Sequence, residues 1–375
     1  MTALRRASID LLAKLVAVDS CNPSLVPGAA GEGDIVRLLA ERLAVAGFAT
    51  TIVCPPEQAQ RPSLVALAPG PVDAPIVVLC GHLDTVGVAG MDDPFTPRIE
   101  GRRLYGRGAA DMKGGIAALV VAAEHLVATG APVRAVLALV ADEEDANLGS
   151  EAVIAALPAM GVNPTVCLIA EPTDLALART LRGFGVVEVD FAGRAAHSSQ
   201  ASEGINAVTH LGRLLAAVDE RAQDLRALGG DLMVTLVQGG SSAFVIPDRA
   251  TCLVELRTAP EGRGADVHTE VHRLLQDHWQ ATVRLVAARD GWLLTTHGPA
   301  ADLAAALGAA MGTGTTFDAP YWMEAPLWEA LCPTVICGPS GGGLHASDEW
   351  VDLDQVGDFA TAVAGVLGTW TPPSL

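Results

Sequence analysis

The sequence predicts an α/β fold: a mostly parallel sheet with helices on both faces, interrupted by a smaller α+β domain. Three observations support this. The chain has 375 residues, more than the roughly 250–300 at which a single hydrophobic core stops growing. In its first half, short apolar runs alternate with helical patterns, which is typical of βαβ units and a parallel sheet. After about residue 180, apolar and polar residues alternate, which indicates an antiparallel sheet with one solvated face.

The first half of the chain contains the predicted βαβ units. An amphipathic N-terminal helix is indicated by an apolar face made of Ile9, Leu12, Leu15 and Val16. The next predicted helices span residues 34–46, 112–128 and 150–157. The predicted strands span residues 76–80, 133–141 and 166–170. Their continuous apolar character is typical of strands buried on both faces.

The middle of the chain carries the alternating pattern. Its predicted strands are 186–191, 233–238 and 250–258, and its predicted helices are 206–221 and 266–278. The parallel-sheet pattern then returns with a helix at 303–310, a strand at 334–337 and a closing helix at 353–367. We therefore predict one domain built from residues 1–178 and 290–375, and an inserted domain at 179–289.

Composition excludes several classes of protein. The formal net charge is −19, which argues against binding to nucleic acid or to anionic membranes, because both require basic patches. Asp10 and Lys14 interrupt the only apolar stretch near the N-terminus, so we expect neither a signal peptide nor a membrane span. The seven cysteines are scattered and form no CxxC pair. We interpret them as reduced, mostly buried residues of a cytoplasmic protein.

Residues that can bind metal ions follow four of the predicted strands. His82 follows strand 76–80, Glu143 and Glu144 follow 133–141, and Glu171 follows 166–170. His345 lies in the glycine-rich loop after strand 334–337. Ligands of open α/β sheets bind beyond the carboxyl ends of the strands, so these side chains, together with Asp111 just before helix 112–128, are expected to converge on one pocket.

Each of these signals also has an ordinary explanation. A lone histidine before a turn is usually structural, Asp111 has the position of a helix N-cap, and an acidic run is usually a solvated loop. However, Glu143 and Glu144 end an apolar strand, where adjacent carboxylates repel each other unless cations are present. The spacing of His82 and Asp84 suits a metal ligand and the residue that orients its ring. Two histidines and three carboxylates suit a two-metal site better than one tetrahedral zinc.

Five segments resemble motifs of the dinuclear zinc peptidase and deacylase family, which includes acetylornithine deacetylase, succinyl-diaminopimelate desuccinylase, aminoacylase and glutamate carboxypeptidase. They are GHLDTV, LYGRGAADMKGG, ADEED, AEPTD and CGPSGGGLHASDEWV. They occur in the order of the family and extend over residues 81–351. The segment MEAPLWEALCPTVICGPS is most similar to the acetylornithine deacetylase branch.

The resemblance implies a centre with two divalent ions, of which zinc is the first choice and cobalt or manganese are alternatives. It implies that His82 and Glu171 are ligands of one ion. Glu144 and His345 would be ligands of the other, and Asp111 would bridge both. It also implies that residues 1–178 and 290–375 form the catalytic domain, and that residues 179–289 form a lid through which two copies dimerise.

The same resemblance implies other roles. Glu143 would be the general base, and Asp84 would orient the metal-binding histidine. His197, in GRAAHSSQASEGINAV, matches a lid histidine that helps to stabilise the tetrahedral oxyanion, often from the dimer partner; without the resemblance it reads as a surface-loop histidine. Arg257, in ELRTAP, matches an arginine that holds a substrate carboxylate, with a structural salt bridge as the alternative. Glu324, in YWMEAP, is a candidate substrate-facing residue, for which a structural role is equally open.

We therefore predict metal-dependent hydrolysis of the amide bond of a small N-acyl amino acid, with N-acetylornithine as the first candidate. Phe244 stands where many relatives have an asparagine, so the identity of the substrate is left open. A dipeptidase or carboxypeptidase with the same mechanism is the alternative. A non-catalytic metal-binding relative is disfavoured, because all the ligand positions and Glu143 are present.

Overall fold

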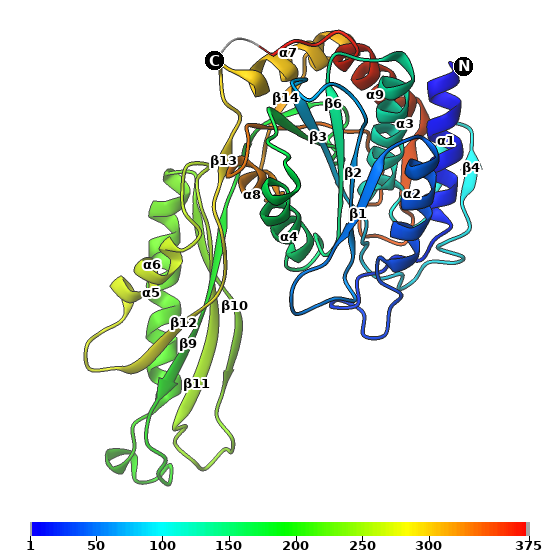
Figure 1. The fold of residues 1–375 in the computed structure, drawn as a ribbon. Coiled ribbons are helices and arrows are strands. Elements are labelled where there is room, and N and C mark those ends of the chain that lie inside the picture. The colour runs from blue at the N-terminus through cyan, green and yellow to red at the C-terminus, as the bar shows by residue number, and fades with distance from the viewer. Residues whose placement is uncertain (1, 373–375) are drawn as a thin grey trace. The chain divides into compact units, whose positions relative to one another are not determined.

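The computed structural model describes residues 2–372, which divide into two compact units (Figure 1). The first unit consists of residues Met1–Ala178, Leu294–Phe317 and Leu327–Leu375. The second unit consists of Arg179–Leu293 and Asp318–Pro326. The second unit is thus an insertion into the first, and it includes two short segments, 290–293 and 318–326, that the sequence pattern assigns to the first domain.

A six-stranded sheet forms the centre of the first unit. Its strands are β1 (Ala49–Val53), β2 (Ser63–Leu67), β3 (Ile76–His82), β6 (Arg134–Val140), β7 (Val166–Ile169) and β15 (Thr334–Ile336). They are arranged in the order β1-β2-β6-β3-β7-β15. The four strands from β6 to β15 are mutually parallel, whereas β1 and β2 form an antiparallel edge. The predicted mostly parallel sheet is confirmed, and β1 and β2 are additions to it.

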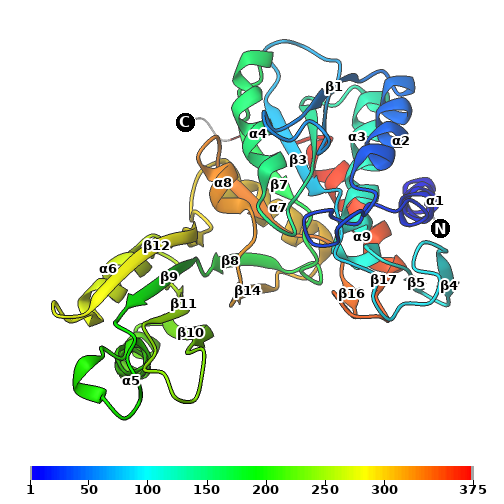
Figure 2. The same ribbon diagram turned by 90° about the horizontal axis from the view of Figure 1, so that it is seen from below.

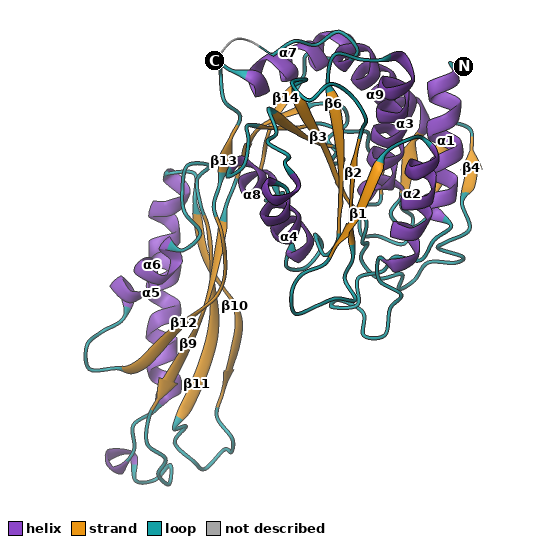
Figure 3. Cartoon of the chain, viewed as in Figure 1, coloured by secondary structure: helices purple, strands orange, loops and turns teal. Residues whose placement is uncertain are grey.

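Helices cover both faces of this sheet (Figures 2 and 3). They are α1 (Ala3–Val16), α2 (Gly33–Val45), α3 (Gly114–Thr129), α4 (Leu148–Ala156), α7 (Pro299–Met311), α8 (Ala325–Glu329) and α9 (Leu353–Leu367). One hydrophobic core joins α1, α2, α3, α7 and α9 to one face of the strands, while α4 lies on the opposite side (Figure 2). Because the central strands are covered twice, their residues are buried without alternation.

A small sheet brings two distant loops of the first unit together. It consists of β4 (Arg98–Glu100), β5 (Arg103–Tyr105), β16 (Gly341–Gly342) and β17 (Trp350–Asp352), in the order β16-β17-β5-β4. Pairing of β17 with β5 places the chain after Tyr105 beside the loop that precedes Trp350. A third sheet, β13-β8-β14, is formed by β8 (Leu177–Leu181), β13 (Trp292–Leu293) and β14 (Thr316–Ala319), and β8 carries the chain from the first unit into the second.

The second unit is an antiparallel sheet with two helices. Its strands are β9 (Phe184–Ala192), β10 (Asp231–Gly239), β11 (Arg249–Arg257) and β12 (Gln280–Arg289), in the order β10-β11-β9-β12. The helices α5 (Ala207–Ala227) and α6 (Asp266–Leu274) share one hydrophobic core with these strands. Buried residues alternate along β9 and β11, as the sequence pattern predicts for a sheet covered on one face.

The predicted helix 266–278 is too long. The helix α6 ends at Leu274, and Leu275 already has an extended backbone with φ −77° and ψ 145°. Residues Gln280–Arg289 instead pair with β9 as strand β12, and His278, expected on the helix, lies in a turn. The helix therefore ends before the turn that leads into β12, and local helix propensity is a weak determinant beside tertiary contacts.

One helical stretch is long and apolar enough to cross a membrane by composition alone. Within the described residues 2–372, this stretch is Ala109–Thr129, and 72% of its most apolar window is buried inside the protein. It contains α3, which packs against α1 and α9 in the core. A buried core helix satisfies the same criteria, so this stretch carries no evidence for a membrane span.

Two helical glycines test how closely α3 packs on the sheet. A Cβ atom added at Gly115 would collide with the carbonyl oxygen of Ala170, whereas one added at Gly365 in α9 would meet nothing within 4 Å. We expect Gly115→Ala to lower the free energy of unfolding by about 1–3 kcal/mol. Gly365→Ala should raise it by about 0.5–1 kcal/mol, because alanine costs less backbone entropy in a helix. Urea unfolding of both variants checks this, and equal stabilities would contradict the packing described.

Candidate metal centre

The site lies where three parallel strands end. His82 is the last residue of β3, Glu143 and Glu144 follow β6, and Glu171 follows β7. Because β6, β3 and β7 are adjacent in the sheet, their carboxyl ends bring these side chains together. Ligand atoms of His82, Glu143 and Glu171 lie within 4.8 Å of one another, and so do ligand atoms of His82, Asp111 and Glu144.

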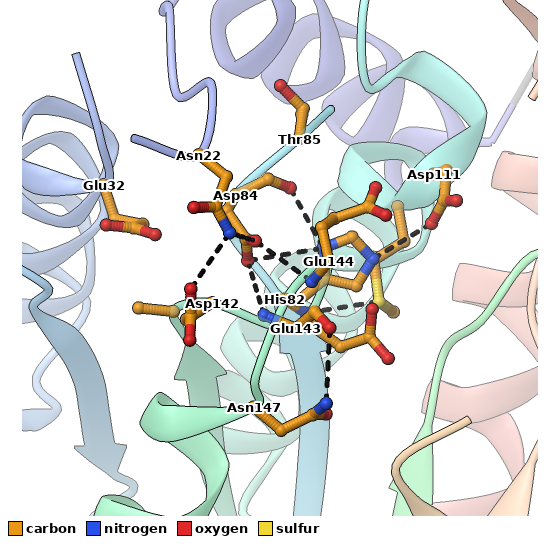
Figure 4. A network of polar contacts seen from close by, with 12 residues as sticks. Asn22, Glu32, His82, Asp84, Thr85, Asp111, Asp142, Glu143, Glu144 and Asn147 are labelled. Carbon is orange, nitrogen blue, oxygen red and sulfur yellow. Dashed lines mark hydrogen bonds and ion pairs between the residues drawn. The ribbon is translucent and has the colours of Figure 1, made fainter. Parts of the chain in front are cut away.

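The His82 ring is held with one nitrogen directed into the site (Figure 4). Its Nδ1 lies 3.0 Å from the main-chain carbonyl oxygen of Asp84. Because a carbonyl oxygen only accepts hydrogen bonds, Nδ1 carries a proton, and Nε2 is the ring nitrogen that faces the site. The Asp84 carboxylate lies farther away, with Oδ1 3.8 Å from Nδ1. The orienting contact expected from the Asp84 side chain is therefore made by its main chain.

Asp111 lies between two imidazole rings. Its Oδ1 is 2.9 Å from His82 Nε2, and its Oδ2 is 3.2 Å from His345 Nε2. Glu144 Oε2 lies 3.2 Å from the same nitrogen of His345. Each oxygen of Asp111 therefore faces a different histidine, which is the arrangement required of a carboxylate shared by two cations.

The structure also decides between two interpretations of Asp111. The helix α3 begins at Gly114, its N-cap residue is Lys113, and Lys113 makes no side-chain capping bond. Asp111 lies two residues before that N-cap position, in the preceding segment Ala109–Lys113. The carboxylate is directed at the two histidines, so Asp111 is not the N-cap of α3.

His345 is presented by a left-handed backbone. Its φ is 60°, a conformation that is uncommon for residues other than glycine and that costs free energy. The side chain is 53% exposed, in contrast to the 1% exposure of His82. The site is therefore closed on the side of the sheet and accessible on the side of the His345 loop.

The carboxylates of the cluster favour positive charge at the site. Burial opposes ionisation of Asp111, but hydrogen bonds from His345 and His82 outweigh it and hold the pKa of Asp111 well below its usual value. Hydrogen bonds to Asp111 and Glu144 raise the pKa of His345 to about 10. Burial disfavours the charged form of His82, yet its bond to Asp111 raises its pKa well above the usual value. The carboxylates thus hold protons on both rings in the absence of other cations.

One carboxylate oxygen indicates room for a cation. Oε1 of Glu144 is buried and has no hydrogen-bond partner among residues 2–372, and burial raises the pKa of this carboxyl. A buried polar atom without a partner costs free energy. Imidazole nitrogens and carboxylate oxygens are ligands that zinc and other divalent transition metals accept. The donor set therefore fits divalent cations.

A second carboxylate, Glu349, fixes the segment that carries Asp111. Its Oε1 accepts the backbone N–H groups of Ala110 and Asp111, at 2.9 and 3.1 Å. Its Oε2 accepts the N–H of Gly108 and Nη1 of Arg107, at 2.9 and 2.6 Å. Glu349 is 1% exposed, so four donors satisfy a buried carboxylate and hold the backbone of Asp111 in place.

The same ion pair ties down the loop of the second histidine. Nη2 of Arg107 donates to the main-chain oxygen of Ala346, at 3.1 Å, directly after His345. Arg107 and Glu349 were not predicted as functional from the sequence, although both lie within motifs that carry the family resemblance. The sequence feature that could have indicated their role is the presence of an arginine and a glutamate within otherwise glycine-rich and polar loops.

The other candidate residues lie in the second unit. His197 is exposed, and its Nδ1 lies 2.8 Å from Ser199 Oγ and accepts the backbone N–H of Ser199 at 3.2 Å. Arg257 ends β11 and donates from Nε to Glu255 Oε1 at 2.6 Å. Glu324 is fully buried. These three side chains belong to a different compact unit from the residues that surround Asp111.

Comparison with known proteins identifies the family. The model that describes peptidase family M20/M25/M40 matches residues 78–369. The chain belongs to this family and is a hydrolase, and the resemblance stated from its motifs is confirmed.

The relatives include deacylases. The chain is 30% identical to a succinyl-diaminopimelate desuccinylase of Rhizorhabdus wittichii, over 96% of this chain and 97% of the relative. It is 27% identical to an acetylornithine deacetylase of Proteus mirabilis, over 92% of both chains.

Solved structures of peptidases share the fold. The aminopeptidase PepT of Bacillus cereus has a TM-score of 0.79 at 16% identity, covering 97% of this chain and 98% of that one. An M20 family metallo-carboxypeptidase of Sulfolobus solfataricus has a TM-score of 0.77 at 16% identity, covering 98% of this chain and 99% of that one. At this identity the two structures support the fold.

Substitution of Glu349 tests its role in holding Asp111. In Glu349→Gln an amide replaces the acceptor of four hydrogen bonds, so the Asp111 segment should loosen. We expect the affinity for zinc to fall by about 10–100-fold, measured by competition with a chelating dye. Glu124→Gln is the matched control, because Glu124 pairs with Arg42 on two helices away from the site. Equal zinc affinities of the two variants would contradict this role.

Proposed function

We propose that this protein hydrolyses the amide bond of a small N-acyl amino acid with the help of two divalent cations. N-acetylornithine is the first candidate substrate, and zinc is the first candidate metal, with cobalt and manganese as alternatives. The observation that carries the proposal is Asp111, whose two oxygens face two different histidines beside Glu143 and Glu144. The deacylases among the relatives support an acyl amino acid as substrate.

The proposal assigns each ligand to an ion. His82 and Glu171 would hold one cation, Glu144 and His345 the other, and Asp111 would bridge them. Such cations lower the pKa of a coordinated water and polarise the substrate carbonyl. A solved dinuclear metal-binding peptidase of the same family, from Bacillus subtilis, has a TM-score of 0.71 to this chain, which supports the fold that holds this centre.

Glu143 is the proposed general base. Its backbone N–H donates to Asp84 Oδ1 at 3.0 Å, which fixes the start of its side chain. Its carboxylate lies within the same 4.8 Å group as His82 and Glu171. A carboxylate there can take a proton from the attacking water and return it to the leaving amine, which is the proton transfer that amide hydrolysis requires.

His197 is the proposed donor to the oxyanion. Because its Nδ1 accepts the N–H of Ser199, a neutral ring carries its proton on Nε2. An Nε2–H group is a hydrogen-bond donor suited to a developing negative oxygen. The unit that carries His197 is the proposed lid.

Arg257 and Glu324 are also proposed at the substrate-binding surface. The ion pair between Arg257 and Glu255 is the contact expected of the structural alternative, because the carboxylate of Glu255 opposes the binding of a second anion there. Glu324 is buried in the second unit, which suits a structural role as well. Replacing each by alanine and comparing KM with kcat would separate binding from structure.

A homodimer through the second unit is also proposed. Exposed apolar residues lie on both edge strands of its sheet: Leu236 and Val237 on β10, and Leu285 and Val286 on β12. Unpaired edge strands with apolar residues are surfaces on which further strands pair.

The cytoplasmic compartment predicted from the cysteines stays a prediction.

A dipeptidase is the second candidate function. Solved structures with this fold include a human carnosine dipeptidase, with a TM-score of 0.67 at 18% identity, covering 97% of this chain and 96% of that one. Water attack on a peptide bond requires the same centre and the same base. The difference between the two functions therefore lies in the residues that contact the acyl group.

Glu143→Gln tests the catalytic assignment. We expect kcat for amine release to fall by about 10²–10⁴-fold, because the amide cannot accept the proton, while the metal content stays that of the unmodified protein. Asp145→Asn is the matched control, since Asp145 is an exposed member of the same acidic run and should leave kcat unchanged. Equal rates for Glu143→Gln and the unmodified protein would sink the assignment.

A substrate screen with metal removal tests the reaction class. We expect release of a free amine from N-acetyl, N-succinyl or N-formyl amino acids, loss of that activity after dialysis against a chelator, and recovery on adding zinc, cobalt or manganese. Amine release is measured with a fluorogenic amine reagent. A clear preference for dipeptides would favour the second candidate, and activity that survives full removal of the metals would refute the metal mechanism.

A further inference from the structure

A buried network of polar side chains contacts the turn that carries Glu143 and Glu144 (Figure 4). Its members are Asn22, Glu32, Arg61, Asp84 and Asp142, and each has a relative exposure of 1% or less. None of them is assigned to a cation or to substrate above. Buried charges of this kind are costly unless they are paired, so their persistence behind the active site calls for an explanation.

Arg61 is the centre of the network. Its Nε lies 3.1 and 3.0 Å from the two carboxylate oxygens of Glu32, and its Nη2 lies 2.6 Å from Oε1. Its Nη1 lies 2.7 Å from Asp142 Oδ1 and 3.0 Å from Ser24 Oγ. All three nitrogens of the guanidinium are engaged. A lysine has no planar fork and cannot reproduce this set of contacts.

Asp142 links Arg61 to the turn. Its φ is 67°, a left-handed conformation in which the chain leaves β6 and reverses toward the site. Its carbonyl oxygen accepts the N–H of Asn147 at 2.6 Å, and its Oδ2 accepts the N–H of Leu148 at 3.4 Å. Ser63, two residues after Arg61, accepts the N–H of Ala141 at 3.0 Å. The start of β2 thus holds the end of β6 at two successive residues.

Asn22 connects the same carboxylate to the backbone of Glu143 and Glu144. Its Nδ2 donates to Asp142 Oδ1 at 3.1 Å and to Asp84 Oδ2 at 2.8 Å. The Asp84 carboxylate in turn accepts the N–H of Glu143 at 3.0 Å and that of Glu144 at 3.2 Å. A continuous chain of contacts therefore runs from Arg61 to the backbone that aims both glutamates.

The charges explain why a positively charged side chain is needed beside Asp142. Asp84 and Asp142 are two buried carboxylates that share the amide group of one asparagine, so they repel each other. The guanidinium of Arg61 offsets the charge of Asp142 through Oδ1, the same oxygen that accepts from Asn22. Removing it would leave Asp142 buried without its cationic partner, and the segment would gain by turning that side chain toward solvent.

We propose that Arg61 is a positioning residue that holds the Glu143–Glu144 turn in its catalytic geometry through Asp142. It touches neither substrate nor the proposed cations. This inference rests on the proposed function in one respect, namely that Glu143 is the general base. It predicts that loss of Arg61 lowers turnover at saturating metal and substrate, because the base is misaimed while the ligand set is retained.

The kinetic test uses the full-length, metal-loaded protein with the substrate that the screen identifies. Arg61→Gln should lower kcat by about 10–100-fold, with KM within about threefold of the unmodified value. The kcat of Arg61→Lys should lie between those of Arg61→Gln and the unmodified protein, because lysine keeps the positive charge but lacks the planar guanidinium. Arg42→Gln is the matched control, since Arg42 makes a two-bond ion pair with Glu124 in the same unit at 2.7 Å, and it should leave kcat within about twofold.

Asp142→Asn gives an independent route to the same result. Asparagine tolerates the left-handed conformation as aspartate does, so this variant removes the charged partner of Arg61 and keeps the backbone preference. It carries the test if Arg61→Gln does not fold. If the two residues act as one unit, the double variant should be no slower than the slower single variant. Multiplied losses in the double variant would contradict a shared path.

A measurement without substrate separates this inference from the proposed function. Hydrogen exchange of the full-length protein, with its metals and after chelation, reports on the amides of residues 142–148. Arg61→Gln should raise their exchange rates by about tenfold or more while the amides of α3 keep their protection. The inference is overturned if kcat and local exchange both match the Arg42→Gln control, or if protection is lost throughout the first unit. If the unmodified protein releases no amine, the proposed function fails and the exchange result still decides the role of Arg61.

Discussion

Repulsion among buried carboxylates is the constraint on which this structure depends. The parallel order of β6, β3 and β7 places Asp84, Glu143, Glu144 and Glu171 at one edge of one sheet, and the segment before α3 places Asp111 beside His82. Apolar strands deliver these acids to a region with little water, where like charges raise one another's energy. The surrounding structure supplies N–H donors to Asp84 and imidazole rings to Asp111 and Glu144, and the two proposed cations would supply further positive charge.

The negative charge of the carboxylates is offset both next to the proposed cations and farther from them. Close to the reaction, histidine nitrogens face the carboxylates that would bind cations, and one glutamate oxygen is left for a metal to satisfy. Farther back, two arginines pair with acids that would bind no cation: Arg107 with Glu349, and Arg61 with Glu32 and Asp142. The first pair holds the segment of the proposed bridging ligand, and the second holds the turn of the proposed base. We therefore expect metal affinity and turnover to depend on separate buried ion pairs.

The clustering of the candidate ligand residues could be predicted from the sequence, but the residues that hold their segments in place could not. Strand-end positions identified His82, Glu144 and Glu171, because parallel strands share one carboxyl edge, and their clustering did not require knowledge of the loops. The contacts of Arg61 and Glu349 could not be predicted, because they join residues 29 and 242 positions apart, and no local pattern records such pairs. For the same reason the strand β12 was missed, since it depends on pairing with β9.

The position of two cations on either side of Asp111 tests the central claim most directly. Crystals of the zinc-loaded protein, measured at the zinc absorption edge, should show two anomalous peaks. Each peak should lie about 2.0–2.2 Å from an Asp111 oxygen, one beside His82 and the other beside His345. A single peak, or two peaks of which neither contacts Asp111, would contradict the account. The first result would establish that the charge gathered at this sheet edge is balanced by two bound metals.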